Sequence, residues 1–260
     1  MCLLVVAFQL FSDEPLIVGA NRDEVLERPA TAITVLDSGQ PRVIGGRDEL
    51  SGGTWLAVNE RGVFAGLTNQ PLGEAKDPSR RSRGELPLAL ARHQSAATAV
   101  EDFLQRYRPS DYNGSWILVG DRSSLFFIDF TGLADPSAVP LPPGLHVLEN
   151  RPLGEASAKV DLVLEVFGAP TDSDATTEAF RAVLTDHRLP EGDDRPQAAN
   201  CVHLDGYGTR SACLARVPSD AKQLPRVWVA AGPPCATPFE DASELWSTDL
   251  AAAQPRTSGL

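Results

Sequence analysis

Residues 2–24 read CLLVVAFQLFSDEPLIVGANRDE and predict how the fold begins. Residues 2–10 are apolar enough for a buried strand, residues 12–15 are typical of a turn, and residues 16–20 supply a partner strand. The chain is therefore expected to open with an antiparallel hairpin. Because antiparallel pairing returns the end of the second strand to the start of the first, the residues after the hairpin should lie beside residue 2.

Cys2 follows the initiator methionine directly. Methionine aminopeptidase generally removes Met1 when the second residue is as small as cysteine, and Cys2 would then be the mature N-terminus. An α-amine titrates near pH ~7.7–8.0 and a thiol near ~8.5, so the amine can take the proton of its own thiol. This pattern indicates a self-contained nucleophile. The alternative is a small buried strand residue that happens to stand second.

The tetrapeptide after the hairpin, residues 21–24, supplies polar groups for that nucleophile. Asp23 can accept a hydrogen bond from the α-amine, and Arg22 can lower the pKa of the thiol. The alternative is a charged turn in which Arg22 and Asp23 form an ion pair on the surface. Since strand neighbours point to opposite faces, Arg22 and Asp23 both reach Cys2 only if the backbone bends there, whereas Asn21 and Asp23 share a face.

Four further residues are candidates for the site. Asn69 ends a predicted strand, and its amide is the type of donor that an oxyanion hole needs, although a strand-end Asn also favours a turn. Asn150 permits the same two interpretations. Trp55 is expected to pack beneath the glycine-rich flap of residues 45–55. Arg210 is suited to bind a carboxylate or phosphate of the substrate, and an ordinary surface arginine is an equally good interpretation.

Short strands and helical segments alternate along the rest of the chain. Strands are expected at residues 32–36, 55–58, 63–67, 116–119, 125–130, 145–148, 211–217 and 227–231, and helices within 85–107, 158–167 and 176–187. The segment 189–200 is the best linker candidate, but too few strands follow it for a second domain. One domain of mixed, mainly antiparallel character over residues 1–260 is expected, with 246–260 as a flexible tail.

Composition narrows the classes of function. Of the 260 residues, 35 are acidic and 23 basic, which argues against nucleic acid or an anionic membrane surface as a partner. Glycine and proline contribute 21 residues each, which favours many turns between short strands. The apolar opening is too short to span a bilayer, so no membrane insertion is expected. Four cysteines without a CxxC pair fit a reducing compartment, and we expect a cytoplasmic protein.

The remaining cysteines and histidines do not predict a metal site. Cys201, His203 and Cys213 suggest a zinc cluster, but their spacing matches no common zinc pattern. His93, His146 and His187 stand singly in the sequence and support no catalytic triad. Neither a metal nor a cofactor is therefore predicted.

Six motifs in a fixed order carry a family resemblance. They are Met1-Cys2, NRDE at residues 21–24, GGTWLAV at 52–58, GLTN at 66–69, SRG at 82–84 and YGTR at 207–210. Together they resemble the NRDE family, which includes the transport and Golgi organisation protein 2 homologues. That family resembles the cysteine N-terminal-nucleophile hydrolases, which include choloylglycine hydrolases and penicillin V acylases. The resemblance implies an α+β fold, an αββα sandwich of two mainly antiparallel sheets.

The resemblance also implies chemistry at a linear amide or related acyl bond of a small molecule, by hydrolysis or acyl transfer. Cys2 would be the nucleophile, Arg22 and Asp23 its tuning and orienting pair, and Asn69 an oxyanion donor. Asn21, Trp55, Asn150 and Arg210 remain substrate-binding candidates. The bile-salt and penicillin acylases separate the arginine from the aspartate by two residues, whereas here the two are adjacent.

A second hypothesis belongs to a different class of function. Members of the resembled family are connected with haem trafficking and with acyl-CoA and lipid homeostasis. The protein would then be a non-catalytic carrier of a hydrophobic ligand such as haem or acyl-CoA, with Cys2 or a histidine as an iron ligand. Retention of Met1 would favour the carrier. The sequence predicts neither the substrate nor the oligomeric state.

Overall fold

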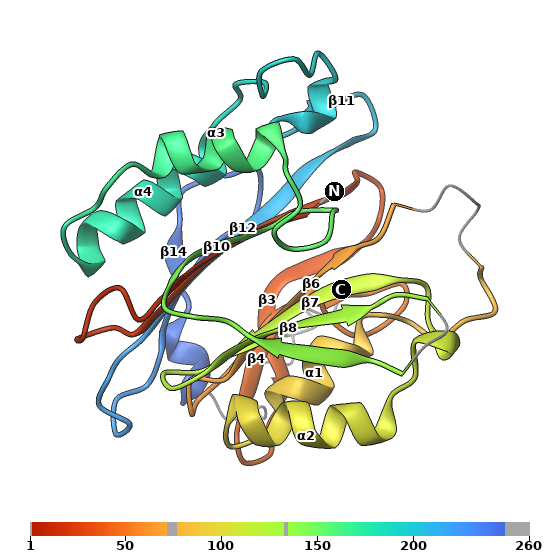
Figure 1. Cartoon of the computed structure of the whole chain (residues 1–260), viewed down its shortest axis with the longest axis vertical. Helices are drawn as coiled ribbons and strands as arrows, with labels where there is room; N and C mark the ends of the chain where they lie inside the picture. Colours follow the sequence, from red (N-terminus) through yellow and green to blue (C-terminus); the bar gives the residue numbers. More distant parts are fainter. Residues whose placement is uncertain (1, 72–76, 133–134, 248–260) are drawn as a thin grey trace, which may run out of the picture.

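The computed structural model describes residues 2–71, 77–132 and 135–247, and two antiparallel sheets dominate it (Figure 1). The sheet that contains the N-terminal strand has the order β10-β1-β2-β12-β13-β14, with β11 paired to β12. Its strands are β1 (Leu3–Phe8), β2 (Leu16–Val25), β10 (Gly144–Leu148), β11 (His203–Leu204), β12 (Tyr207–Val217), β13 (Arg226–Ala230) and β14 (Glu240–Asp241).

The second sheet runs in chain order from β3 to β9. Its strands are β3 (Ala30–Asp37), β4 (Val43–Asp48), β5 (Leu56–Asn59), β6 (Phe64–Asn69), β7 (Ser115–Gly120), β8 (Leu125–Phe130) and β9 (Ser137–Pro140). Each consecutive pair is antiparallel. Apart from residues 70–114 between β6 and β7, the connections between these strands are short, which explains the turn-rich composition.

Helices cover the outer face of each sheet (Figure 1). The α-helices are α1 (Glu85–Ala91), α2 (Ala96–Arg106), α3 (Ala158–Phe167) and α4 (Ser173–Thr185), and the short 3₁₀ turns are η1 (Pro109–Asp111), η2 (Pro196–Ala198) and η3 (Ser243–Trp246). The first two pack on the second sheet, and α3 and α4 pack on the N-terminal sheet. The predicted αββα sandwich is confirmed. No helix in the described ranges is long and apolar enough to cross a bilayer.

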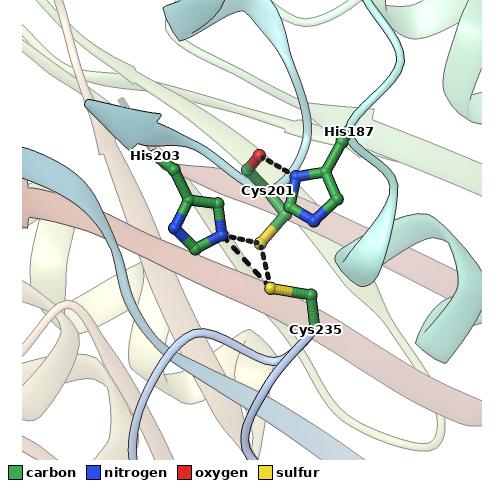
Figure 2. A group of neighbouring side chains, drawn as sticks. All are labelled: His187, Cys201, His203 and Cys235. Carbon is green, nitrogen blue, oxygen red and sulfur yellow. Dashed lines mark hydrogen bonds between the residues drawn. The ribbon is translucent and has the colours of Figure 1, made fainter.

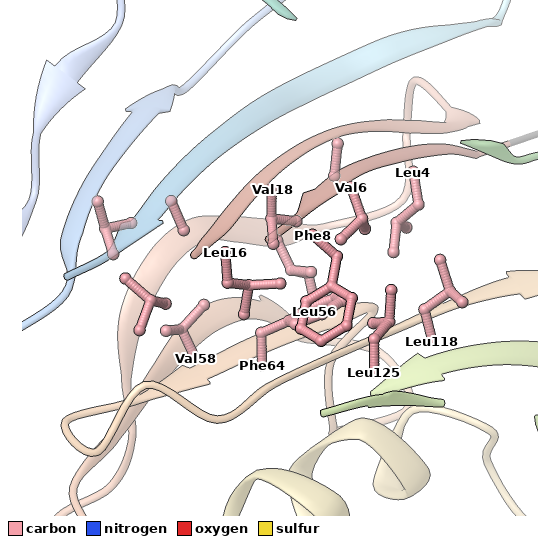
Figure 3. Packing of buried hydrophobic residues seen from close by; sticks show 14 of the residues in the cluster. Leu4, Val6, Phe8, Leu16, Val18, Leu56, Val58, Phe64, Leu118 and Leu125 are labelled. Atoms are coloured by element: carbon pink, nitrogen blue, oxygen red, sulfur yellow. The ribbon is translucent and has the colours of Figure 1, made fainter. Parts of the chain in front are cut away.

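Strand β1 is buried on both faces. Leu4, Val6 and Phe8 belong to the core between the two sheets (Figure 3). Leu3 and Val5 belong to the core beneath α3 and α4. A strand buried on both sides must be apolar at every position rather than at alternate ones, which accounts for the uninterrupted hydrophobic opening of the chain.

Strand β2 is longer than the sequence predicts. Residues 16–20 were expected to form the strand, but it continues to Val25 because β12 pairs with it along its whole length. Residues 21–24 therefore lie inside the sheet, with Arg22 and Asp23 buried. The interpretation of this tetrapeptide as a charged surface turn is wrong.

The helical segment 85–107 comprises two helices, and Ser95 caps the second by accepting a hydrogen bond from the Thr98 nitrogen at 3.2 Å. The expected C-terminal tail needs correction. Trp246, expected in the flexible tail, is buried, and its Nε1 donates to the Pro225 carbonyl at 2.8 Å. The predicted tail beyond residue 247 lies outside the described residues.

The two-sided burial of β1 generates a stability prediction. Leu4 is 1% exposed in the core between the sheets, and Leu4→Ala should lower the free energy of unfolding by about 2–5 kcal/mol. Leu50 is 67% exposed, so the matched control Leu50→Ala should change it by less than about 0.5 kcal/mol. Urea unfolding monitored by tryptophan fluorescence measures both. Equal effects of the two variants would contradict the packing described.

Candidate active site

Cys2 is anchored at the start of β1. It is 8% exposed, and its backbone nitrogen donates to Oδ1 of Asn150 at 3.1 Å. It lines a cleft of about 680 Å³ together with Trp55 and Asn69. The second residue of the chain is thus fixed in place and borders a space that fits a small molecule.

Asn150 joins the two sheets at this point. It follows β10, and its Nδ2 donates to the carbonyl oxygen of Asn69, the last residue of β6, at 2.5 Å. A second link is close by, because the Thr68 hydroxyl donates to the Glu149 carbonyl at 2.7 Å. Asn150 therefore positions both Cys2 and Asn69, and it does not itself line the cleft.

Arg22 lies against the indole of Trp55. Its guanidinium carbon is 4.4 Å from the ring centroid, a cation–π contact, and both residues line the cleft. Burial lowers the pKa of Arg22, and Nη2 has no hydrogen-bond partner among the described residues. Gly46 makes room for the indole, since a Cβ there would come within 2.0 Å of Trp55 Cζ2. The glycine-rich stretch can pack against Trp55 because Gly46 has no side chain.

Asp23 is buried with one carboxylate oxygen unpaired. Its Oδ1 accepts a hydrogen bond from the Thr209 hydroxyl at 2.6 Å, while Oδ2 has no partner in the described part of the chain. Burial raises the pKa of this carboxyl, and the ammonium of Lys159 and the guanidinium of Arg22 oppose that rise. The free oxygen is available to a further donor at the site.

A β-bulge explains how Arg22 and Asp23 both line the cleft. The register of β2 with β12 shifts between Thr209, which pairs with Asp23, and Ser211, which pairs with Arg22. Arg210 is the extra residue. A bulge increases the local twist, and this is the backbone irregularity that two adjacent site residues require. Arg210 is close enough to Arg22 to lower the pKa of Arg22, but it does not line the cleft.

Asn21 lies on the helix side of the sheet. It is buried, and its amide nitrogen donates to the carbonyl oxygens of Leu184, at 2.9 Å, and Asn200, at 2.8 Å. It does not line the cleft. Asn21 therefore holds the end of α4 and the segment before β11 against β2.

Two further basic residues contribute to the site, and the first of them, Lys159, was not among the sequence candidates. Lys159, in the first turn of α3, is buried with Nζ donating to the Ala199 carbonyl at 2.9 Å. Burial lowers the pKa of Lys159, and the nearby Asp23 carboxylate opposes this. Arg83 lines the cleft and donates to the Gly114 carbonyl at 3.0 Å. Burial also lowers the pKa of Arg83, and the Cys2 thiolate opposes this.

The charges around Cys2 act on its thiol in opposite directions. Burial is the main cause that raises the pKa of Cys2, and the negative charge of Asp23 raises it further. The positive charge of Arg22 lowers it. A buried thiol of this kind is mostly protonated at neutral pH, so a base is needed to make it a nucleophile.

A group of histidines and cysteines lies apart from the cleft (Figure 2). His187, Cys201, His203 and Cys235 bring one potential metal-ligating atom each within 4.8 Å of one another. From the sequence, Cys213 was the expected partner of Cys201 and His203, and His187 was expected to stand alone. That grouping is wrong, because Cys213 packs in the core between the sheets. Only Cys201 and His203, at the start of β11, are close in the sequence, and His187 and Cys235 come from two other segments, so no short motif marks the whole group.

The sequence of the chain matches a known protein family over most of its length. The family Transport and Golgi organisation 2 matches residues 1–222. The chain belongs to this family. The Transport and Golgi organization protein 2 homolog of Bos taurus is 29% identical over 235 residues, which cover 79% of this chain and 83% of that protein. The Homo sapiens homolog is 27% identical over 233 residues with the same coverage. The NRDE resemblance is confirmed.

Two solved structures of hydrolytic enzymes share the fold. The Caenorhabditis elegans ortholog of N-acylethanolamine-hydrolyzing acid amidase has a TM-score of 0.59 and 14% identity, over 88% of this chain and 99% of that chain. A C2A mutant of the conjugated bile acid hydrolase from Clostridium perfringens has a TM-score of 0.50 and 10% identity, over 93% and 96%. These likenesses place the chain in the N-terminal-nucleophile-hydrolase fold.

The opposing charges beside Cys2 predict opposite shifts in its reactivity. Arg22→Gln removes a charge that stabilises the thiolate, so the pKa of Cys2 should rise and alkylation should need a higher pH. Asp23→Asn should lower the pKa of Cys2 and move the profile to lower pH. The rate of iodoacetamide labelling against pH, read on the Cys2 peptide by mass spectrometry, measures both. Arg106→Gln, on the exposed side of α2, is the control and should leave the midpoint unchanged. Shifts in the same direction for both site variants would contradict the arrangement.

Proposed function

We propose that the protein is an N-terminal-cysteine hydrolase or acyltransferase that acts on a linear amide or acyl bond of a small molecule. The observation that carries this proposal is the hydrogen bond from the Cys2 nitrogen to Asn150 Oδ1, beside a cleft that Cys2 and Asn69 both line. Removal of Met1 turns that nitrogen into an α-amine while its acceptor stays in place. Nucleophile, base and oxyanion donor then border one space.

The reaction proceeds in two halves. The α-amine takes the thiol proton, and the Cys2 sulfur bonds to the carbonyl carbon of the substrate. The oxygen becomes an oxyanion that the Asn69 amide stabilises. As the carbonyl re-forms, the bond to the leaving group breaks, and that group takes the proton from the α-ammonium. Water, or an acceptor hydroxyl or amine, then gives its proton to the α-amine and attacks the thioester carbonyl carbon. The bond to sulfur breaks, the acyl product is released, and the α-ammonium returns its proton to the sulfur, which restores the thiol.

Asp23 is the positioning residue for the base in this proposal. Its unpaired Oδ2 is a suitable acceptor for a proton of the α-ammonium, and Thr209 fixes the other oxygen. The buried ammonium of Lys159 partly compensates the carboxylate charge. A charged amine that forms during catalysis is thereby stabilised within a buried site.

The cleft favours a substrate with a negatively charged group. Arg28 pairs with Asp48 at 2.8 Å and Arg81 with Glu85 at 2.6 Å, so those charges are compensated. Neither Arg22 nor Arg83 forms an ion pair with a described residue. These two guanidinium groups are thus available to a carboxylate or phosphate on the substrate.

The lining of the cleft also separates this proposal from the carrier of a hydrophobic ligand. Its described charged residues are Arg22, Asp23, Glu24, Arg28, Asp48, Arg80, Arg81 and Arg83. The apolar macrocycle of haem, or the acyl chain of an acyl-CoA, needs a mainly apolar wall. The charged wall therefore supports a polar substrate over a hydrophobic cargo.

Replacing the nucleophile is the direct test of this function. With a panel of acyl amides and thioesters, Cys2→Ala should lower turnover by about a thousandfold or more, because the sulfur forms the covalent intermediate. Cys213→Ala, which removes a thiol outside the cleft, should keep wild-type turnover. Circular dichroism and intact mass establish that both variants fold and have lost Met1. Full activity of Cys2→Ala would refute the mechanism, and saturable haem or acyl-CoA binding without turnover would favour the carrier.

The unpaired arginine in the cleft wall predicts substrate selectivity. Arg83→Gln should lower kcat/KM for anionic substrates about tenfold or more, because a hydrogen bond to a charged group is lost. Neutral analogues should change by less than about twofold. Arg81→Gln is the matched control, since Glu85 already neutralises Arg81. An equal loss for anionic and neutral substrates would contradict the assigned role of Arg83.

A further inference from the structure

Four side chains with metal-binding atoms converge beside β11, and the proposed catalysis uses none of them. His187 follows α4, Cys201 and His203 flank Val202 ahead of β12, and Cys235 lies in the loop after β13. Figure 2 shows the two imidazoles and the two thiols gathered around a common centre. Segments distant in the chain thus present four ligands to one point.

The distances among three of these atoms match a tetrahedral site. The sulfurs of Cys201 and Cys235 are 3.7 Å apart, and Nε2 of His203 is 3.7 Å from the first and 3.2 Å from the second. A zinc ion bound at about 2.3 Å to sulfur and about 2.0–2.1 Å to nitrogen separates its ligands by about 3.3–3.8 Å. The three atoms therefore already form one face of the tetrahedron.

The fourth ligand, His187, is oriented by a hydrogen bond from its ring to a backbone carbonyl. Nδ1 of His187 lies 3.0 Å from the carbonyl oxygen of Cys201, so Nδ1 donates and Nε2 is left with its lone pair. The rings of His187 and His203 are 5.1 Å apart between centroids. A ligating histidine usually donates its second nitrogen to a carbonyl in this way, and the contact fixes the tautomer that metal binding needs.

We propose that His187, Cys201, His203 and Cys235 form a structural zinc site. Two thiolates and two neutral imidazoles are a ligand set that Zn²⁺ prefers, and the resulting site carries no net charge. Four protein ligands close the coordination sphere, so the ion has a structural role rather than a catalytic one. Each thiol gives up its proton on binding, and two protons are released for each ion bound.

The zinc ion would stabilise the segment that positions Asp23. The nitrogen of Val202, between two of the ligands, donates to the Thr209 hydroxyl at 2.9 Å. That hydroxyl donates to Asp23 Oδ1 at 2.6 Å. Cys235 would fasten the same segment to the loop after β13. The site thus connects metal binding to the geometry beside Cys2 through two hydrogen bonds.

Metal analysis of the full-length protein tests the proposal. The protein is reduced, stripped with a chelator, incubated with Zn²⁺ and desalted, and bound zinc is counted by mass spectrometry. About one zinc per chain is expected. Cys235→Ser and His203→Ala should each retain less than about a tenth of that amount, whereas Cys213→Ala should retain all of it. Co²⁺ in place of Zn²⁺ should give a cobalt–thiolate absorption band that Cys235→Ser lacks.

Several outcomes would overturn the proposal. Zinc that is absent from the reduced wild type, or that stays equally bound in Cys235→Ser, refutes the site. A disulfide between Cys201 and Cys235 with no zinc uptake after reduction refutes it as well. If His203→Ala does not fold, alkylation of the exposed Cys235 in the wild-type protein replaces it as the test. Wild-type Cys235 should then resist alkylation until chelator is added, and equal labelling with and without zinc contradicts the site.

Discussion

The antiparallel pairing of β1 with β2 on one side and β10 on the other determines where the site forms. It places the second residue of the chain at the end of a strand that is buried on both faces. A one-residue slip of β1 would move each side chain to the opposite face of the sheet, into a core packed around a different side chain. Apolar contacts would be lost in both cores, so the slip is costly in free energy. Cys2 is therefore held by the whole core, and Asn150 only completes its orientation.

The pairing of β2 with β1 and β12 also places charged side chains in the interior. Strand β2 carries Arg22 and Asp23 into the sheet, where their ionised forms lose solvation. The fold compensates in part through the indole of Trp55, the hydroxyl of Thr209 and the ammonium of Lys159. Buried, incompletely paired charges of this kind are typical of functional sites, since a purely structural sheet would be more stable without them.

Much of the fold follows from local sequence pattern. The opening hairpin, the cap at Ser95 and the proximity of the NRDE tetrapeptide to Cys2 depend on residues near one another in the chain. The burial of Lys159 against Asp23 was not predicted, because it depends on how α3 docks on the sheet. The grouping of Cys235 with His187 was missed for the same reason, since loop positions do not repeat with a period that a sequence shows. The bulge at Arg210 likewise becomes visible only when β2 and β12 pair.

The central claim is that Cys2, as the mature N-terminus, carries the acyl group during the reaction. Intact-mass measurement of protein quenched in acid during turnover of an activated acyl substrate tests this most directly. We expect a chain without Met1 that gains the mass of one acyl group, located by peptide mapping on Cys2. A chain that retains Met1, or an acyl group located on Cys201, Cys213 or Cys235 instead, would contradict it.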